Sequence, residues 1–342
     1  MTDVYTYMAD GVVELEYPVP NPEPLANLLH GLREDERLAT LHVDNGNPSI
    51  IAENLEPATE ITKTLVETLS DGSVLSFGLE SADPAVHKEN WLNCNADQLK
   101  TAIRLVNKYG KERGERGLPK LLPGLNFIAG LNGESAETYG LNKQLLNQIR
   151  NENLWLRRIN IRQVEGIGFQ EIPTDLFKDF KTWTRDEIDA PLLTELFPLG
   201  LKLSGVTWEA HDGRIRLPAH LGEEHRDPAI HGKAGITFGR QIGAYPILIG
   251  VPYHIPLETT TDIIVTGHGA RSITGVECGL KMSTVTQKQL ESMPGIGEKS
   301  AWNLISARAK AASKGREFWT IDEWFDKAGV EMPDLTARVL EA

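Results

Sequence analysis

The feature that most constrains the fold is an alternation, in the first half of the chain, of short apolar runs with segments of helical periodicity. Each run ends in polar residues or glycine, as buried parallel strands commonly do. The runs expected to be strands are 38–44, 74–81, 121–130 and 154–164. Because the connections between them are long enough to hold helices, the pattern predicts an α/β fold whose parallel sheet is covered by helices.

Helix signals lie between and before these runs. Segments 24–37 and 57–70 repeat leucine or isoleucine at three- and four-residue spacing. Asn95 is expected to cap a helix that has Gln98 at its third position, and Gly110 is expected to end that helix. Ser135 is the expected N-cap of the next helix.

The number of strand–helix units is too small for a closed barrel. Four units occupy residues 24–164, whereas a closed eight-fold barrel takes roughly 250 residues. We therefore predict part of a (β/α) barrel over residues 1–205, with the rest missing or supplied elsewhere. Segment 4–17 is a candidate for one further strand.

The second half of the chain changes character. Over residues 206–280 the helical signal disappears, glycine and proline recur, and short β-prone runs lie between them. With runs such as 247–251 and 262–266, this predicts a small β-rich domain, a barrel or a sandwich. Residues 281–342 return to helix and form the third predicted domain.

Charge and hydropathy argue against three classes of protein: those that contact nucleic acid over a large surface, those that span a membrane and those that are secreted. Lys and Arg number 35 against 48 Asp and Glu, a net charge of −13, so any contact with nucleic acid has to be local. No run approaches the roughly 18 apolar residues of a membrane span, and the first residues do not resemble a secretion signal. A cytoplasmic protein without membrane contact is expected.

Polar residues gather where the predicted strands end, which is where parallel α/β folds bind ligands. The strand ends carry Asp44-Asn45, Glu80-Ser81, Gly130 leading to Gly133-Glu134, and Arg162-Gln163. One interpretation is a ligand site with carboxylates, amides and closely approaching glycine backbone. The other is a set of structural ion pairs between these carboxylates and the arginines at 157, 158 and 162.

The order of these segments resembles the radical S-adenosylmethionine superfamily, in particular its methylthiotransferase and elongator-type branch. The residues that carry the resemblance are Gly78-Leu79-Glu80-Ser81, the Asn95 helix, and Gly124 followed by Gly130 and Gly133-Glu134. It covers roughly residues 20–310, and the whole arrangement is similar to archaeal radical enzymes that end in a helix-hairpin-helix.

The resemblance implies an Fe-S oxidoreductase that uses S-adenosylmethionine and a 4Fe-4S cluster, with an electron donor, to make a 5′-deoxyadenosyl radical. It places Glu80 and Ser81 near the ribose and methionyl group, and Asp44 and Asn45 nearer the substrate. The other cofactor-binding residues that it implies are Gly124, Asn126, Gly130, Glu134, Arg162 and Gln163. It assigns no catalytic residue in this chain.

The chain departs from the superfamily at the cluster. The family's CxxxCxxC triplet is absent, and the two cysteines, Cys94 and Cys278, have no metal-ligand spacing and are expected to pack in the interior. The cluster would have to come from a missing N-terminal segment or from an upstream partner chain. Alone, this polypeptide is not expected to generate a radical.

Residues 289–301 have the pattern of a helix-hairpin-helix, with Pro-Gly-Ile-Gly between two helices. Residues 281–320 hold seven Lys or Arg against three Glu, a net charge of +4 that suits phosphate-backbone contact. Gly295, Gly297, Lys299 and Arg308 are the expected nucleic-acid-binding residues, and Trp302 is expected in the core. The alternative is a hairpin that only packs helices or binds protein.

Four histidines, His211, His220, His225 and His231, fit no standard zinc spacing, so no metal site is predicted. Three hypotheses remain. The chain is part of a radical enzyme, a cluster-less remnant that binds nucleic acid or protein through 281–320, or a metabolic α/β enzyme that uses the rim of Asp44, Glu80 and Glu134.

Overall fold

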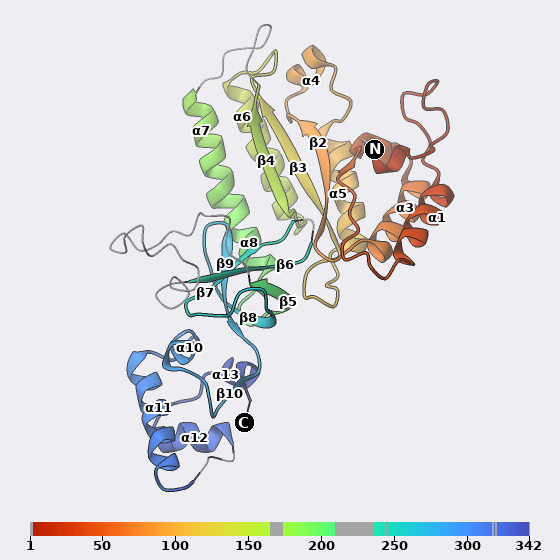
Figure 1. The fold of residues 1–342 in the computed structure, drawn as a ribbon. Helices are drawn as coiled ribbons and strands as arrows, with labels where there is room; N and C mark the ends of the chain where they lie inside the picture. Colours follow the sequence, from red (N-terminus) through yellow and green to blue (C-terminus); the bar gives the residue numbers. More distant parts are fainter. Residues whose placement is uncertain are drawn as a thin grey trace. The chain divides into compact units, whose positions relative to one another are not determined.

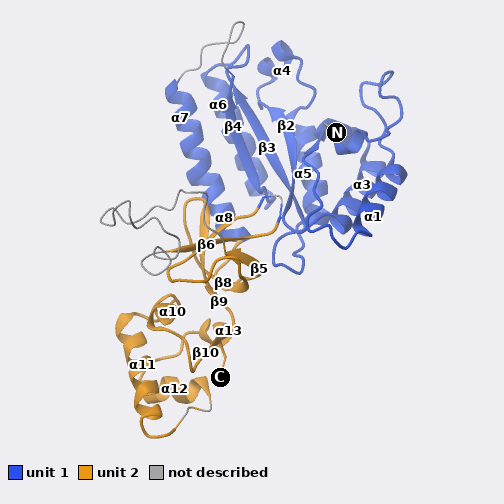
Figure 2. Ribbon diagram, in the orientation of Figure 1, with its two compact units in different colours: residues 1–196, 243–245 blue, residues 197–242, 246–342 orange. Residues whose placement is uncertain are grey.

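The chain folds into two compact units (Figure 2). In a computed structural model, unit 1 comprises Met1–Leu196 and Gly243–Tyr245, and unit 2 comprises Phe197–Ile242 and Pro246–Ala342. The structure describes residues 3–164, 174–208, 236–243, 245–316, 318 and 320–341. The predicted boundary between residues 205 and 206 falls inside a strand of unit 2, and the barrel and the helical end of the chain share that unit.

Unit 1 is built on a four-stranded parallel sheet in the order β1-β2-β3-β4, which confirms the predicted α/β class. The strands are β1 (Asn45–Gly46), β2 (Ser73–Glu80), β3 (Leu121–Ala129) and β4 (Arg158–Gln163). Ser76 of β2 pairs with Gly124 of β3, which in turn pairs with Arg158 of β4.

Helices connect these strands, and Figure 1 shows α5 and α6 behind β2, β3 and β4. The helical segments of unit 1 are η1 (Val4–Thr6), α1 (Pro22–Arg33), α2 (Pro48–Glu53), α3 (Leu55–Thr68), α4 (Pro84–Asn90), α5 (Ala96–Gly110), α6 (Ala136–Asn151), α7 (Thr174–Trp183), the π-helix η2 (Thr184–Asp189) and α8 (Ala190–Leu196).

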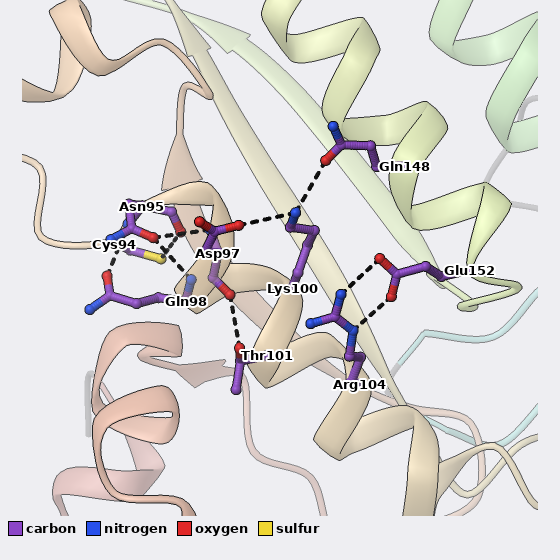
Figure 3. A network of polar contacts seen from close by, with 9 residues as sticks. All are labelled: Cys94, Asn95, Asp97, Gln98, Lys100, Thr101, Arg104, Gln148 and Glu152. Carbon is purple, nitrogen blue, oxygen red and sulfur yellow. Dashed lines mark hydrogen bonds and ion pairs between the residues drawn. The ribbon is translucent and has the colours of Figure 1, made fainter.

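The predicted ends of α5 are confirmed. The Asn95 side chain accepts hydrogen bonds from the N–H groups of Asp97 and Gln98 at 3.0 Å each, while Gln98 Oε1 accepts from the N–H of Asn95 at 3.1 Å (Figure 3). This capping box satisfies donors that the first helical turn leaves without partners. Further along α5, Arg104 forms a bidentate ion pair with Glu152 just after α6.

The two faces of the sheet differ in polarity. Leu75, Phe77 and Phe127 point into a core shared with α5, α6 and α7. On the other face, Val74 and Leu122 near the strand starts are apolar and buried. Further along, the positions of the same parity carry small or polar residues, namely Ser76, Gly78, Gly124, Asn126 and Asn160, and we call this the polar face. Parallel sheets normally bury apolar residues on both faces, so the polar face has the composition of a surface that lines a ligand site.

Two strand predictions are wrong. Segment 38–44 forms no strand, and only Asn45–Gly46 joins the ladder. The backbone groups of segment 38–44 instead make isolated hydrogen bonds, such as the one from Leu41 N–H to Ser70 Oγ at 3.0 Å. Segment 4–17 contains the 3₁₀ turn η1, because Asp3 caps that turn by accepting from the N–H of Tyr5. Segment 38–44 also makes backbone hydrogen bonds, such as Ser70 N–H to Leu41 O at 3.0 Å, but these form no continuous ladder.

Unit 2 contains a closed five-stranded barrel in the order β5-β6-β7-β9-β8. Its strands are β5 (Lys202–Trp208), β6 (Thr237–Gln241), β7 (Leu248–Val251), β8 (Thr260–His268) and β9 (Ser272–Glu277). The β7–β9 pair is parallel and the others are antiparallel. Trp208 is fully buried inside, and its indole N–H donates to Thr261 Oγ1 at 2.8 Å.

The end of unit 2 is helical. It consists of α10 (Gln287–Glu291), α11 (Glu298–Ala312), α12 (Ile321–Ala328) and α13 (Thr336–Val339), with β10 (Leu280–Lys281) paired to β11 (Leu340–Glu341). Across the described ranges of both units, none of the helices combines the length and the apolar character that a bilayer crossing requires.

Two glycines of unit 1 provide a matched test of its packing. A Cβ at Gly110 would lie 2.0 Å from the backbone oxygen of Leu121, whereas a Cβ at Gly140 of α6 would meet nothing within 4 Å. We expect Gly110→Ala to lower the free energy of unfolding by about 2 kcal/mol or more. We expect Gly140→Ala to raise it by about 0.5–1 kcal/mol, because alanine favours the helix.

Urea unfolding followed by circular dichroism measures both changes. Equal effects of the two substitutions would contradict the close approach of α5 to β3.

Candidate functional site

A cavity of about 560 Å³ lies at the carboxyl ends of β1, β2 and β3 in unit 1. This volume is in the range of small-molecule and cofactor sites. The residues that define its chemistry are Asp3, Asn45, Gly78, Glu80, Trp91 and Asn126. Glu80, Asn45 and Asn126 were predicted site residues, and the fold brings the three together although they come from three different strands.

Glu80 is placed by an irregularity at the end of β2. The register shifts between Gly78 and Glu80, and Glu80 adopts a left-handed backbone with φ of 69°. This conformation is unfavourable for a side chain other than glycine, by roughly 1–2 kcal/mol. It folds the carboxylate back over Gly78, where a Cβ would lie 2.7 Å from Glu80 Oε1. Gly78 is therefore needed for Glu80 to reach its position.

The Glu80 carboxylate is held in an unfavourable environment. Its Oε2 atom is buried and has no hydrogen-bond partner among the described residues. Burial raises the pKa of Glu80 to about 7, and the nearby Arg162 lowers it in part. Unsatisfied buried carboxylate oxygens are rare in native proteins and mark positions where a ligand completes the hydrogen bonding.

Asp3 is a second carboxylate in the same cavity, and the sequence did not identify it as a site residue. Its Oδ1 atom accepts from the N–H groups of Tyr5 and Asn47, each at 3.0 Å. Its Oδ2 atom is buried without a partner in the described part of the chain, and burial raises its pKa. The only sequence signal was an aspartate preceding a helical turn, which predicts a cap and not a ligand site.

The cavity contains two buried carboxylates, each with one oxygen that has no hydrogen-bond partner among the described residues. They favour a ligand that carries positive charge or several N–H or O–H donors. Asn126 adds an amide, whose Oδ1 already accepts from Asn160 Nδ2 at 2.8 Å on the polar face. The cavity can therefore bind a cationic, donor-rich small molecule.

Trp91 forms part of the cavity rim and is 93% exposed. It ends α4 in a left-handed conformation with φ of 55°, and its N–H donates to the carbonyl of His87. The preceding Asn90 is bound to the loop after β3, because its Nδ2 donates to Asn132 O at 2.7 Å and its Oδ1 accepts from Asn132 N–H. The hydrogen bonds of Trp91 N–H and of the Asn90 side chain fix the backbone at this point, so the large exposed ring can pack against a bound ligand.

Other predicted cofactor residues lie close to the cavity but shape it indirectly. Ser81 is buried and its Oγ accepts from the N–H of Asp83 at 3.1 Å. Glu134 is buried and accepts from the N–H of Gly130 at 2.7 Å and from the hydroxyl of Tyr139. These residues hold the loops that follow β2 and β3.

Four other residues that were predicted for this site do not line the cavity. Gly124 sits inside the sheet, where a Cβ would come within 3.0 Å of Val74 Cγ1. Arg162 and Gln163 end β4 and do not line the cavity. Asp44 accepts a hydrogen bond from the Tyr245 hydroxyl at 2.6 Å, and so points away from its neighbour Asn45.

Two of the three arginines of the ion-pair interpretation have other contacts, while the charge of Arg162 is near enough to Glu80 to lower the pKa of that carboxyl. Arg157 donates to the backbone oxygen of Tyr245 at 3.1 Å, and the Arg158 guanidinium lies 5.0 Å from the centre of the Tyr245 ring.

The hairpin of unit 2 forms as its sequence pattern indicates. Gly295 has φ of 91° in the turn, Gly297 is the N-cap of α11, and Lys299 is exposed in its first turn. Arg308 is used structurally, since its Nη1 donates to the carbonyls of Met282 and Val285 at 2.9 and 2.8 Å.

The prediction that Trp302 lies in the core is wrong. Its side chain is 61% exposed, because Ala301 and Leu304 occupy the buried side of α11.

Neither cysteine belongs to a group of three ligand-type side chains among the described residues, although Cys94 lines the cavity. Cys94 is buried at the entry to α5, and burial raises the pKa of its thiol to about 12. Cys278 lies in unit 2, where burial also raises its pKa. Within the described ranges, no three His, Cys, Asp or Glu side chains are grouped to hold a metal ion. His211, His220, His225 and His231 lie outside the described residues.

Comparison with known proteins finds relatives but no function. No protein-family model matches the chain. An uncharacterised protein of Archaeoglobus fulgidus is 35% identical over 307 residues, which cover 86% of this chain and 53% of that protein. The uncharacterised protein MJ0274 of Methanocaldococcus jannaschii is 35% identical over 283 residues, covering 80% and 48%. The chain spans about half the length of these relatives.

Because Glu80 is buried, we expect its ionisation to destabilise the folded chain as the pH rises. Its pKa of about 7 in the folded chain exceeds its ordinary value of 4.5, so the folded chain holds this proton more tightly than the unfolded chain. The stability that this proton contributes is present below about pH 4.5 and is lost as the pH rises through 7. We expect Glu80→Gln to melt at a higher temperature than the parent at pH 8 and at the same temperature near pH 4.

Scanning calorimetry at both pH values measures this difference. Glu36→Gln, which changes an exposed carboxylate in the turn after α1, is the control and should match the parent at both. A Glu80→Gln variant less stable than the parent at pH 8 would show that the carboxylate has a partner after all.

Proposed function

We propose that this chain is the S-adenosylmethionine-binding part of a radical enzyme, with the cofactor bound in the cavity at the ends of β1, β2 and β3. The observation that carries the proposal is the buried, unpartnered carboxylate of Glu80, held over Gly78 in a strained conformation inside that cavity. The same Gly-x-Glu-Ser segment carries the sequence resemblance to the superfamily.

The donor set of the cavity fits this cofactor. S-adenosylmethionine carries an ammonium group, a sulfonium centre and ribose hydroxyls, and the cavity offers two unpartnered carboxylate oxygens on Asp3 and Glu80. Asn45 and Asn126 add amide groups at the same strand ends. When bound, the cofactor supplies the group that abstracts a hydrogen atom from the substrate in this superfamily.

The residues of this chain would bind and orient the cofactor. A cation beside Glu80 favours its ionised form, so binding would release the proton that the free carboxyl holds near pH 7. Trp91 would cover the cavity mouth on one side. The polar face would add the Ser76 hydroxyl and the Asn126 amide, since both residues line the same cavity.

The iron–sulfur cluster does not fit this chain, because two cysteines in separate units cannot supply three thiolates. We propose that the cluster is held by another polypeptide segment, either a partner chain or sequence equivalent to the other half of the longer relatives. The polar face of the sheet and the length of those relatives both favour such a completion.

Equilibrium dialysis with radiolabelled S-adenosylmethionine tests the proposal on the full chain. We expect saturable binding that Glu80→Gln weakens roughly 10- to 100-fold, since a charge-assisted hydrogen bond is lost. Because ionised Glu80 binds the cation, affinity should rise between pH 6 and pH 8 in the parent, and this rise should be smaller in Glu80→Gln.

Two further variants sharpen the result. Gly78→Ala should weaken binding without unfolding, because its Cβ would displace the end of the Glu80 side chain, and Glu36→Gln should bind as the parent does. If the parent does not bind the cofactor at any of these pH values, the radical-enzyme proposal fails and the metabolic-enzyme hypothesis for this cavity takes its place.

A second candidate function is nucleic-acid binding by the hairpin of α10 and α11. It is favoured by Trp302, an exposed aromatic ring three residues after the exposed Lys299 at the start of α11. A Cβ at Gly297 would meet nothing within 4 Å, so a phosphate can approach this helix end.

Binding of a labelled 20-base-pair DNA duplex tests this function. We expect Lys299→Gln to weaken binding several-fold and to flatten its salt dependence, whereas Lys327→Gln on α12, equally exposed, should have little effect. Equal effects of the two substitutions would show that the duplex is attracted by exposed positive charge in general and not bound by the hairpin.

A further inference from the structure

A row of three polar side chains crosses the polar face of unit 1 from β4 to the cavity. Arg158 Nε donates to Asn160 Oδ1 at 2.9 Å, and Asn160 Nδ2 donates to Asn126 Oδ1 at 2.8 Å. Arg158 and Asn160 belong to β4 and do not line the cavity, whereas Asn126 of β3 does. The row therefore connects the last strand of the sheet to the wall of the candidate site.

The chemistry of these groups fixes the direction of both hydrogen bonds. A guanidinium has donors and no acceptor, so the Asn160 atom that faces Arg158 has to be the carbonyl oxygen. The amide nitrogen of Asn160 then faces Asn126, and the Asn126 atom that meets it has to be an oxygen as well. An isolated asparagine can rotate its carboxamide and exchange the two atoms. Here the guanidinium sets the orientation of both carboxamides.

Arg158 is itself held beside the sheet. Its guanidinium lies 5.0 Å from the centre of the Tyr245 ring, within the range of a cation–π contact. The Tyr245 hydroxyl in turn donates to Asp44 Oδ1 at 2.6 Å. These contacts keep the guanidinium where it can donate to Asn160.

As a result, Asn126 presents N–H donors to the cavity. Its Oδ1 atom faces β4, so its Nδ2 atom faces away from β4, and Nδ2 has no hydrogen-bond partner among the described residues. Gly78 pairs with Asn126 on that side, and the Glu80 carboxylate is folded over Gly78. Because neighbouring strands are about 4.8 Å apart, carboxylate acceptors and amide donors lie side by side in one cavity.

We propose that Arg158 and Asn160 are positioning residues that fix the polarity of the cavity, and that its ligand carries a hydrogen-bond acceptor within about 5 Å of a cationic or hydroxyl donor. The donor would meet Glu80, and the acceptor would meet Asn126 Nδ2. A ligand with donors alone would leave the Asn126 amide unsatisfied, which lowers affinity.

The inference deepens the proposed function and rests on the cavity being the ligand site. S-adenosylmethionine has the required pair of groups at two places. One is the carboxylate beside the ammonium group, and the other is a ring nitrogen beside the amino group of adenine. The shared requirement is an acceptor next to a donor, and an analogue distinguishes the two places.

Side-chain NMR of the ligand-free full chain, labelled with 15N at asparagine, tests the orientation without any ligand. In the parent we expect the Asn126 NH2 protons to exchange rapidly with water. In Asn160→Asp, residue 160 can only accept at about pH 6.5, so the Asn126 NH2 group turns toward β4 and its exchange should slow at least about fivefold. The Asn126 signals are assigned by their loss in Asn126→Asp.

Asn151→Asp, which adds the same charge at an exposed position of α6, is the control and should leave the Asn126 signals unchanged. The inference is overturned if the Asn126 NH2 group exchanges as slowly in the parent as in Asn160→Asp.

Equilibrium dialysis with S-adenosylmethionine tests the consequence for the ligand. Asn160→Asp should weaken binding about three- to tenfold, although residue 160 lies outside the cavity and the added negative charge alone would attract a cation. Arg158→Lys still only donates and should bind within about twofold of the parent. Arg158→Glu only accepts, reverses both carboxamides and should weaken binding as Asn160→Asp does.

Decarboxylated S-adenosylmethionine identifies the acceptor. If Asn160→Asp binds this analogue as the parent does, the acceptor is the carboxylate; if binding is weakened as for the cofactor, the acceptor is a ring nitrogen. Both results support the fixed polarity. If the parent does not bind S-adenosylmethionine but shows the expected exchange, the proposed cofactor is wrong and the polarity of the cavity stands. If the parent and Asn160→Asp bind the cofactor equally, the inference is overturned and the proposed function stands.

Discussion

The parallel sheet of unit 1 has one apolar and one polar face, and the rest of that unit is arranged around this difference. The apolar face, with Phe77 and Phe127, holds α5, α6 and α7 against the strands through a continuous core. The polar face, with Ser76, Asn126 and Asn160, cannot bury itself against such helices without leaving polar groups unsatisfied. It is free to line a cavity, and the cavity lies at the strand ends where that face is richest in hydrogen-bonding groups.

Within this cavity, Glu80 and Gly78 depend on each other. The bulge at the end of β2 and the left-handed backbone of Glu80 bring its carboxylate over residue 78, and only glycine leaves room for it there. The charge of Arg162 offsets the cost of the buried carboxylate only in part, and Glu80 Oε2 has no hydrogen-bond partner in the described part of the chain. Strain and unsatisfied charge at one residue are characteristic of a site organised before its ligand arrives.

Unit 2 shows how two surfaces with similar chemistry arise from different architecture. The hairpin presents Lys299 and Trp302 from a helix, and the barrel presents Phe238 and Arg240 from a strand. In both, an aromatic ring lies beside a cation because the opposite side of the element is filled by core residues, Leu304 in α11 and Gly239 against Trp208 in β6. The chain as a whole has a net charge of −13, so the nucleic-acid binding proposed for the hairpin would depend on positive charge local to α11.

The sequence by itself determined the local elements of unit 1: the capping box at Asn95, the end of α5 at Gly110 and the strands β2 and β3. These follow from hydrogen bonds and periodicity between residues near in sequence. Segment 38–44 has the same apolar character as a strand, yet only two residues after it join the ladder, because strand formation requires a partner with matching N–H and C=O groups.

Only the tertiary structure decided which polar residues share a site. Asp3 and Glu80 are distant in sequence and line one cavity, whereas Ser81 and Glu134 turn inward to hold loops. It also decided that Trp302 is exposed while Arg308 binds carbonyls, although both belong to α11. Which side of a helix or strand is buried depends on what packs against it, and a single sequence does not contain that information in local form.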